Sequence, residues 1–199
     1  MADDDSPTLD PNGRTVSARE RILQVAYQLF TRRGIRDVGI DELIARAKVA
    51  KASFYRHFPS KNDLILEVLQ RREQLWTHGL VEKQSRERGA TPEEQLLAIF
   101  DVFDDWFHHH EAFDGCSFIN VLLEMGSSHP AGKASIRYLE NIRAILQDRA
   151  QQAGLRDAEN FARSFHVLMK GSIVSATEGD LLAAQRAKTM ARSLIDSHR

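Results

Sequence analysis

The segment from Lys51 to Phe58 combines residue types that suit binding to a polyanion. It reads Lys-Ala-Ser-Phe-Tyr-Arg-His-Phe, with cations and a phenol beside small and apolar side chains, and Pro59 follows it. Because proline disfavours helical geometry in the residue before it, we expect a short helix that ends at this point. Residues 14–61 contain eleven Lys and Arg residues but four acidic ones, a net charge of +7, which leaves −8 for the rest of the chain. This asymmetry indicates a basic module that meets a polyanion; a charged solvent face is the alternative.

Cys116 is the only cysteine of the chain, so the sequence excludes an internal disulfide and a multi-cysteine zinc module. A thiolate with His129 or His166 as its base would be the arrangement of a nucleophilic enzyme, but no motif links these residues and the basic module would then have no role. We therefore expect no enzyme. Redox sensing by Cys116 would require a nearby cation that stabilises the thiolate, and a buried, inert thiol is the more common case.

The run His108-His109-His110-Glu111 could suggest a metal site. Consecutive residues of a helix point about 100° apart, so these side chains cannot converge on one ion. Ligands drawn from this run together with Cys116 or His129 are the alternative. We expect a solvated helix end, with no metal and no cofactor.

Apolar residues recur at helical spacing along the chain and predict an all-α fold. Residues 1–13 lack this period and carry four aspartates, so we expect a disordered leader there. No run approaches the roughly 18 apolar residues of a membrane span, and the N-terminus does not resemble a signal peptide, which favours a cytoplasmic protein without a membrane partner. The expected helices begin near Ser17, Asp41, Lys51, Ser60, Thr91, Cys116, Pro130, Asp157 and Asp180, and glycines at 34, 126 and 154 follow three of them. Capping boxes are expected at Ser17–Glu20 and Thr91–Glu94, and Ser60 with Asp63 is expected to cap the helix that follows.

Three short helices with a basic third one have the order of a helix-turn-helix domain. From Val38 to Lys61 the chain reads VGIDELIARAKVAKASFYRHFPSK. This stretch resembles the DNA-binding signature of the TetR family of transcriptional regulators, and its most diagnostic part is Ser53–Lys61. The resemblance covers about residues 17–66. It implies double-stranded DNA as a partner.

The resemblance also implies a division into domains. Residues 14–61 would form the three-helix DNA-binding domain, with the helix-turn-helix motif at about 38–57. Residues 62–199 would form a helical ligand-binding and dimerisation domain. Cations and a phenol reach phosphates, while small residues allow the helix to approach the bases. The implied DNA-binding residues are Lys48, Lys51, Ala52, Ser53, Tyr55, Arg56, His57 and Lys61, with Phe54 and Phe58 packed beneath the recognition helix.

The sequence departs from the family pattern at three turn or cap positions. Lys48 stands where a glycine is common, Ala50 where a serine or threonine often caps the recognition helix, and Gly39 where a threonine often opens the second helix. Each residue is sterically acceptable in a turn or cap, so the expected fold is unchanged. Lys48 is expected to add a phosphate contact, and Lys61 to contact a phosphate without reading the base sequence.

In the TetR family the C-terminal helices build a ligand pocket. This chain supplies bulky residues on the helices that would surround such a cavity. An ordinary filled core is the alternative for most of them. The residues that we expect to line a pocket for a small-molecule ligand are Trp76, Phe103, Trp106, Phe107, Cys116, Phe118, Ile119, Tyr138, Phe165 and Met169.

The last two expected helices mix large apolar residues with small ones, which allows helices to pack closely. Paired with their two-fold copies they would form a four-helix bundle and set two recognition helices about 34 Å apart, one turn of DNA. Completion of a monomer core is the alternative. The expected interface residues of the homodimer are Leu168, Ser172, Ser175, Ala187, Met190, Ala191 and Leu194.

The hypothesis that follows is a homodimeric repressor that binds a palindromic operator and leaves it when a small molecule binds. The helix that begins at Ser60 would carry the signal, since it runs from the basic module to Trp76. An activator on the same fold is one alternative. A non-specific architectural DNA-binding protein is the other.

Overall fold

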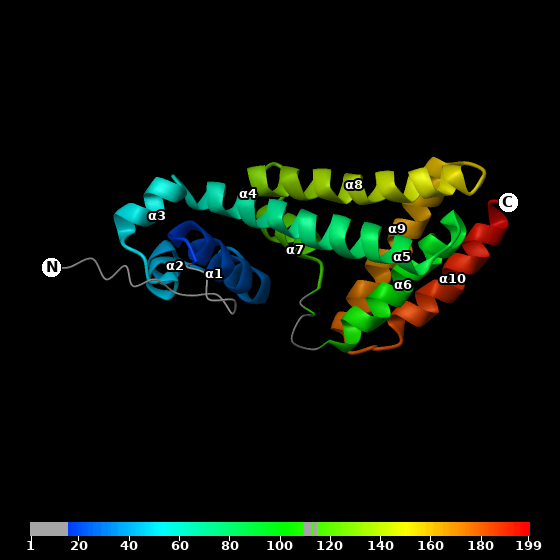
Figure 1. The fold of residues 1–199 in the computed structure, drawn as a ribbon, viewed down its shortest axis with the longest axis horizontal. Helices are drawn as coiled ribbons and strands as arrows, with labels where there is room; N and C mark the ends of the chain where they lie inside the picture. Colours follow the sequence, from blue (N-terminus) through cyan, green and yellow to red (C-terminus); the bar gives the residue numbers. More distant parts are fainter. Residues whose placement is uncertain (1–15, 110–112, 114) are drawn as a thin grey trace. The chain divides into compact units, whose positions relative to one another are not determined.

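The computed structural model describes residues 16–109, 113 and 115–199, and the predicted leader 1–13 lies outside this part of the chain. The described residues form helices and no strand, which confirms the all-α expectation. None of these helices has the length and apolar character needed to cross a membrane. In chain order they are α1 (Ala18–Arg33), α2 (Ile40–Ala47), α3 (Lys51–His57), α4 (Lys61–Arg72), the π-helix η1 (Glu73–Gln84), α5 (Ser85–Arg88), α6 (Pro92–His108), α7 (Ser117–Met125), α8 (Pro130–Gln152), α9 (Ala158–Thr177) and α10 (Ala183–Ser197) (Figure 1).

The helices belong to two compact units. The first unit contains the described residues up to Arg71 together with Ile119–Ser135, and the second contains Arg72–Phe118 and Ile136–Arg199. The first unit is therefore larger than the helix-turn-helix module at 14–61, because it continues along α4 and includes most of α7. Helices α7 and α8 each have residues in both units.

Local signals set the ends of α1. The Ser17 hydroxyl accepts a hydrogen bond from the Glu20 N–H at 3.2 Å, and Gly34 follows the last residue with a φ of 81°. A positive φ is readily adopted by glycine, which explains why the helix ends there. The Glu20 carboxylate was expected to accept a hydrogen bond from the Ser17 N–H. It instead forms an ion pair with Arg71, 2.6 Å away.

The second unit is built around α6, α9 and α10. Thr91 and Glu94 form the predicted capping box at the start of α6, with Thr91 Oγ1 accepting from the Glu94 N–H at 3.2 Å. Helix α10 packs along both α9 and α6 (Figure 1). It begins at Ala183 rather than near the expected Asp180, whose carboxylate instead accepts a hydrogen bond from the Leu182 N–H at 3.0 Å.

One element differs in type from the expectation. The helical stretch after α4 continues past Trp76 as predicted, but residues Glu73–Gln84 form a π-helix. Buried Arg149 lies at its C-terminal end and donates to the Glu82 carbonyl at 2.7 Å and to the Ser85 hydroxyl at 2.7 Å. This partner comes from α8, 67 residues further along the chain.

Candidate nucleic-acid interface

A small apolar core positions α3 in the first unit. Helix α1 packs against α2 and α3, and its Ile22 and Ala26 are fully buried. Leu43 of α2 is also fully buried. From α3 and its C-cap, Phe54 and Phe58 enter this core with ring centroids 6.2 Å apart. The two phenylalanines thus anchor the inner face of the predicted recognition helix.

The opposite face of α3 is open to solvent. Tyr55 is 41% exposed, and its ring meets Phe54 edge-on at 5.4 Å. His57 and Ser53 are half-buried. The structure thereby brings the predicted DNA-binding residues of this helix to one surface, with the apolar side chains beneath. The exposed ones are Lys51, Ala52, Tyr55 and Arg56.

The turn between α2 and α3 is held by a buried arginine. Lys48 ends α2 in the left-handed region, with φ 52° and ψ 54°, and is exposed. Arg21 of α1 donates to the Ala47 carbonyl at 3.1 Å and to the Lys48 carbonyl at 3.3 Å. The cation satisfies carbonyls that a helix end leaves without partners. Ala50 and Gly39, at the other two departures from the family pattern, precede α3 and α2 without a side-chain cap.

Lys61 begins α4 and is half-buried. Its Nζ donates to the Ile35 carbonyl at 2.6 Å and lies 5.9 Å from the centre of the Phe30 ring. Burial lowers the pKa of Lys61, and the negative charge of Glu124 opposes this shift. A phosphate contact of Lys61 remains a prediction, and the structure shows that the ammonium already has one backbone partner.

Sequence reasoning missed two positioning residues in this unit. Arg21 lies beside the apolar stripe of α1, and Glu124 of α7 accepts from the N–H groups of Ile35 and Arg36. The one local signal for Arg21 was its place in the sequence directly before Ile22, a residue of the apolar stripe. Glu124 gave none, because its partners lie 88 and 89 residues away in the sequence.

Comparison with known proteins agrees with this arrangement. The family model described as "Bacterial regulatory proteins, tetR family" matches residues 22–68, which contain the whole helix-turn-helix. A crystallised TetR-family transcriptional regulator from Streptomyces coelicolor is 26% identical in sequence, with a TM-score of 0.81 over 91% of this chain and 95% of that one. The chain belongs to the TetR family of bacterial regulatory proteins.

The curated relatives include both an activator and a repressor of transcription. The transcriptional activator FasR of Mycolicibacterium smegmatis is 34% identical over 91 residues, 46% of this chain and 41% of its own length. The transcriptional repressor NemR of Escherichia coli is 29% identical over 107 residues, 54% of this chain and 53% of its own. The match thus spans about half the length of these relatives. They are regulators rather than enzymes, in agreement with the expectation of no enzyme.

The predicted ligand-binding residues of this TetR-family chain lie mostly in a closely packed aromatic cluster. Trp76 has ring neighbours in Phe103, Trp106 and Phe118, at 5.9, 6.0 and 6.2 Å. Phe118 also meets Tyr138 at 5.3 Å. All of the predicted ligand residues except the half-buried Ile119 are buried. Packing of this kind is what the alternative, a filled core, would give.

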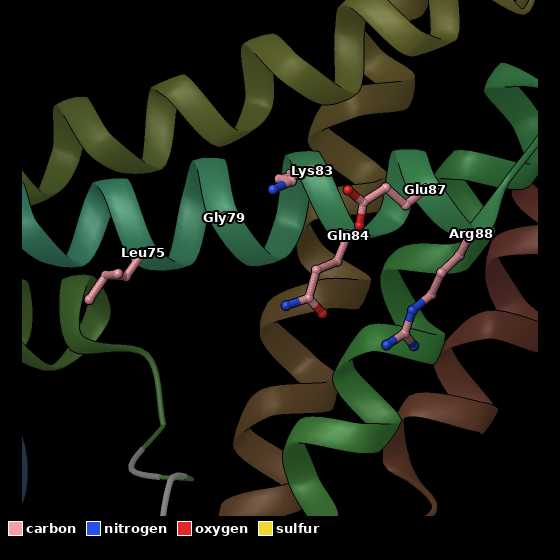
Figure 2. Close-up of a pocket in the computed structure, with 6 residues that line it drawn as sticks. All are labelled: Leu75, Gly79, Lys83, Gln84, Glu87 and Arg88. Carbon is pink, nitrogen blue, oxygen red and sulfur yellow. The ribbon is translucent and has the colours of Figure 1, made fainter. Parts of the chain in front are cut away.

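A pocket lies elsewhere in the second unit, with a volume of about 490 Å³. It opens along η1 and α5, and Figure 2 shows the side chains that line it. None of the predicted ligand-binding residues contributes to it. Its charged rim includes Arg88, which forms an ion pair of 2.8 Å with Asp105 of α6. The lining residues are Leu75, Gly79, Lys83, Gln84, Glu87 and Arg88.

The predicted dimer residues fall into two groups. Ser172, Ala187 and Ala191 are at most 5% exposed, so they pack inside the protomer and have no surface to offer a partner. Burial of these small residues within the protomer is what the alternative, completion of a monomer core, would give. Met190 is 57% exposed, and Leu168, Ser175 and Leu194 are half-buried. The same two helices also expose Val167 and Val174, which the sequence reasoning did not select.

The histidine run gives no metal site among the residues that the structure describes. No group of three or more His, Cys, Asp or Glu side chains gathers there. His108 and His109 are exposed, and their Nδ1 atoms lie 2.7 Å from the Asp104 carbonyl and 2.5 Å from the Asp105 carbonyl. His110 and Glu111 lie outside the described residues.

Proposed function

We propose that this protein is a homodimeric repressor that binds a palindromic DNA operator and is released from it by a small-molecule ligand. The observation that supports operator binding best is that α3 has one polar, exposed face and one apolar, buried face. Lys51, Tyr55 and Arg56 face solvent on a helix whose other face is anchored by Phe54 and Phe58. A rigid helix with cations and small residues outward is suited to the major groove. Operator binding also places the protein in the cytoplasm, with the DNA.

The surface of α9 and α10 supports the homodimer. Val167, Val174 and Met190 are 65, 50 and 57% exposed. Helices α9 and α10 pack together, and exposed apolar side chains on such a pair are suited to contact with a partner. A two-fold axis through this surface would pair each helix with its copy, and we assign Leu168, Ser175, Met190 and Leu194 to the interface.

Unpartnered polar atoms in the second unit support a ligand. Trp76 Nε1, Thr77 Oγ1 and His166 Nδ1 are buried and have no hydrogen-bond partner among the residues that the structure describes. Burying a polar group without a partner costs free energy, so such atoms are usually met by water or a ligand. Trp76 is also the centre of the aromatic cluster. We therefore keep this cluster, rather than the pocket along η1 and α5, as the ligand-binding region.

Selection from a pool of random duplexes at two salt concentrations tests the DNA-binding part. We expect one palindrome to be enriched, with half-sites about one helical turn apart, at both concentrations. Equal retention of all duplexes, weakening steeply with salt, would instead support the architectural alternative, since phosphate contacts do not discriminate sequence. Transcription from a promoter that carries the enriched site then separates repression from activation, which FasR exemplifies among the relatives.

A further inference from the structure

A carboxylate of α7 holds the turn that follows α1. Glu124 Oε2 accepts from the Ile35 N–H at 2.9 Å, and Oε1 accepts from the Arg36 N–H at 2.6 Å. Both oxygens are thus used by two consecutive backbone amides. Hydrogen bonds to an ionised acceptor are about twice as strong as neutral ones.

The glycine before this turn makes room for the carboxylate. A Cβ at Gly34 would lie 3.1 Å from Glu124 Oε2, and its φ of 81° also disfavours other residues. The turn is anchored from within as well, because Ile35 and Val38 are at most 2% exposed. Glu124 therefore binds a segment whose backbone has one closely defined position.

The same turn is tied to the start of α4. Lys61 Nζ donates to the Ile35 carbonyl at 2.6 Å, so the peptide groups of Ile35 are held from both sides. Lys61 comes four residues after the end of α3. The connected series Glu124, Ile35, Lys61 thus fixes the α1–α2 turn and the first residue of α4, the helix that follows the predicted recognition helix, in one arrangement.

We propose that Glu124 is a positioning residue for DNA binding, which holds the α1–α2 turn and Lys61 in the arrangement that fits the operator. The inference rests on the proposed operator binding. Glu124 touches no DNA itself; it acts through Ile35, Arg36 and Lys61. It also makes DNA binding depend on α7, a helix whose first residues belong to the second unit.

The test compares E124Q with E67Q, E124D and wild type. Glu67 of α4 lies in the same unit and forms an exposed ion pair of 2.9 Å with Arg19. Both glutamine variants remove one negative charge, so they change non-specific attraction to DNA equally. Only E124Q loses an acceptor for a backbone N–H. We expect its preference for the operator over random duplex to fall about tenfold, with E124D between it and wild type and E67Q unchanged.

Selectivity is measured well below the melting temperature of each variant, so that a loss of stability alone does not change it. Equal selectivity of E124Q and E67Q would overturn the inference, whereas a wild-type protein that selects no duplex would contradict the proposed function instead. Amide hydrogen exchange of the wild type needs no variant. Slow exchange at both Ile35 and Arg36 is expected, and exchange at the rate of an open turn would overturn the role of Glu124 even where E124Q does not fold.

Discussion

Lys48 ends α2 in the left-handed region, with a φ of 52°. A left-handed conformation costs an L-residue about 1–2 kcal/mol, and glycine or asparagine tolerates it better. We expect the positive charge of Lys48 to contribute to DNA binding, a gain in function that offsets this cost in stability. Lys48 lies in the turn that precedes α3, and we expect its ammonium to contact a DNA phosphate in the proposed complex.

Lys48→Asn should therefore separate stability from DNA binding. Asparagine adopts the left-handed region more readily, so we expect the free energy of unfolding to rise by about 0.5–1 kcal/mol. Loss of one phosphate contact should reduce the slope of log affinity against log salt by about one. Urea unfolding and DNA titrations at several salt concentrations measure the two effects. Lys51→Asn is the control: it should lower the slope without the gain in stability, because Lys51 lies within α3.

His166 is a second residue whose chemistry is set by its surroundings. It is 2% exposed, and burial, followed by the charges of Lys170 and Arg143, lowers its pKa to about 3. The unfolded chain, with an ordinary histidine pKa of about 6.5, binds a proton that the folded protein does not. Between these two values the unfolded state therefore gains stability as the pH falls. Above about pH 6.5 both states are neutral, and His166 adds no pH dependence.

His166→Leu should remove this part of the acid sensitivity. From pH 7 to pH 5 we expect the wild type to lose about 2 kcal/mol more unfolding free energy than the variant, from 1.36 kcal/mol per pH unit below 6.5. Denaturant unfolding at the two pH values measures the difference, and carboxylates common to both proteins cancel. His108→Gln, at an exposed site on α6, should behave as wild type. An equal loss in the wild type and His166→Leu would contradict the depressed pKa.

At the scale of elements, local signals predicted the helix ends well. The Thr91–Glu94 capping box, the Ser60–Asp63 cap and the glycine after α1 are all present as expected. Each depends on residues within one or two turns, so the sequence alone contains the cause. The Glu20 carboxylate does not complete a capping box with Ser17, because it forms an ion pair of 2.6 Å with Arg71, which is distant in the sequence.

The π-helix η1 was not predictable in the same way. Its composition is ordinary for an α-helix, and its wider turn is accompanied by partners from other helices. Arg149 of α8 is 2% exposed and donates to Glu82 and Ser85 at the end of η1. Burial, followed by the charge of Arg86, lowers the pKa of Arg149 to about 10, which leaves it charged at neutral pH.

Arg149→Met tests how much this contact stabilises the second unit. The change leaves the Glu82 carbonyl and the Ser85 hydroxyl without their donor, so we expect a loss of about 3 kcal/mol of unfolding free energy. Arg163→Met is the matched control, because Arg163 forms an exposed ion pair with Glu159 one turn away on α9. Its expected cost is below about 0.5 kcal/mol. Similar costs for the two variants in chemical unfolding would show that η1 does not depend on Arg149.

At the scale of the whole molecule, periodicity identified which helices carry each role but not which residues face a partner. The structure buries Ala187, Ala191 and Ser172 within the protomer, although each lies at helical spacing from an interface candidate. A small residue that allows close packing within a protomer looks the same in sequence as one that allows it between protomers. Only the three-dimensional packing distinguishes the two, and it leaves Val174 and Met190 exposed instead.

Substitution of these two exposed residues tests the proposed dimer. Val174→Glu with Met190→Glu places charges where a second protomer would bury apolar surface, so we expect a monomer that keeps its helical content. Sedimentation measures the mass and circular dichroism the fold. Leu75→Glu is the control, since Leu75 is 56% exposed on η1 and the same change there should leave a dimer.

Operator binding should follow the oligomeric state. A dimer binds two half-sites at once, and the second contact is made at the high effective concentration set by the first. A monomer has only one half-site contact, so we expect the double variant to lose at least a hundredfold in affinity for the palindrome while its affinity for a single half-site equals that of the wild type. A double variant that stays dimeric would move the interface away from α9 and α10. A monomer with undiminished operator affinity would show instead that two-fold symmetry has no part in recognition.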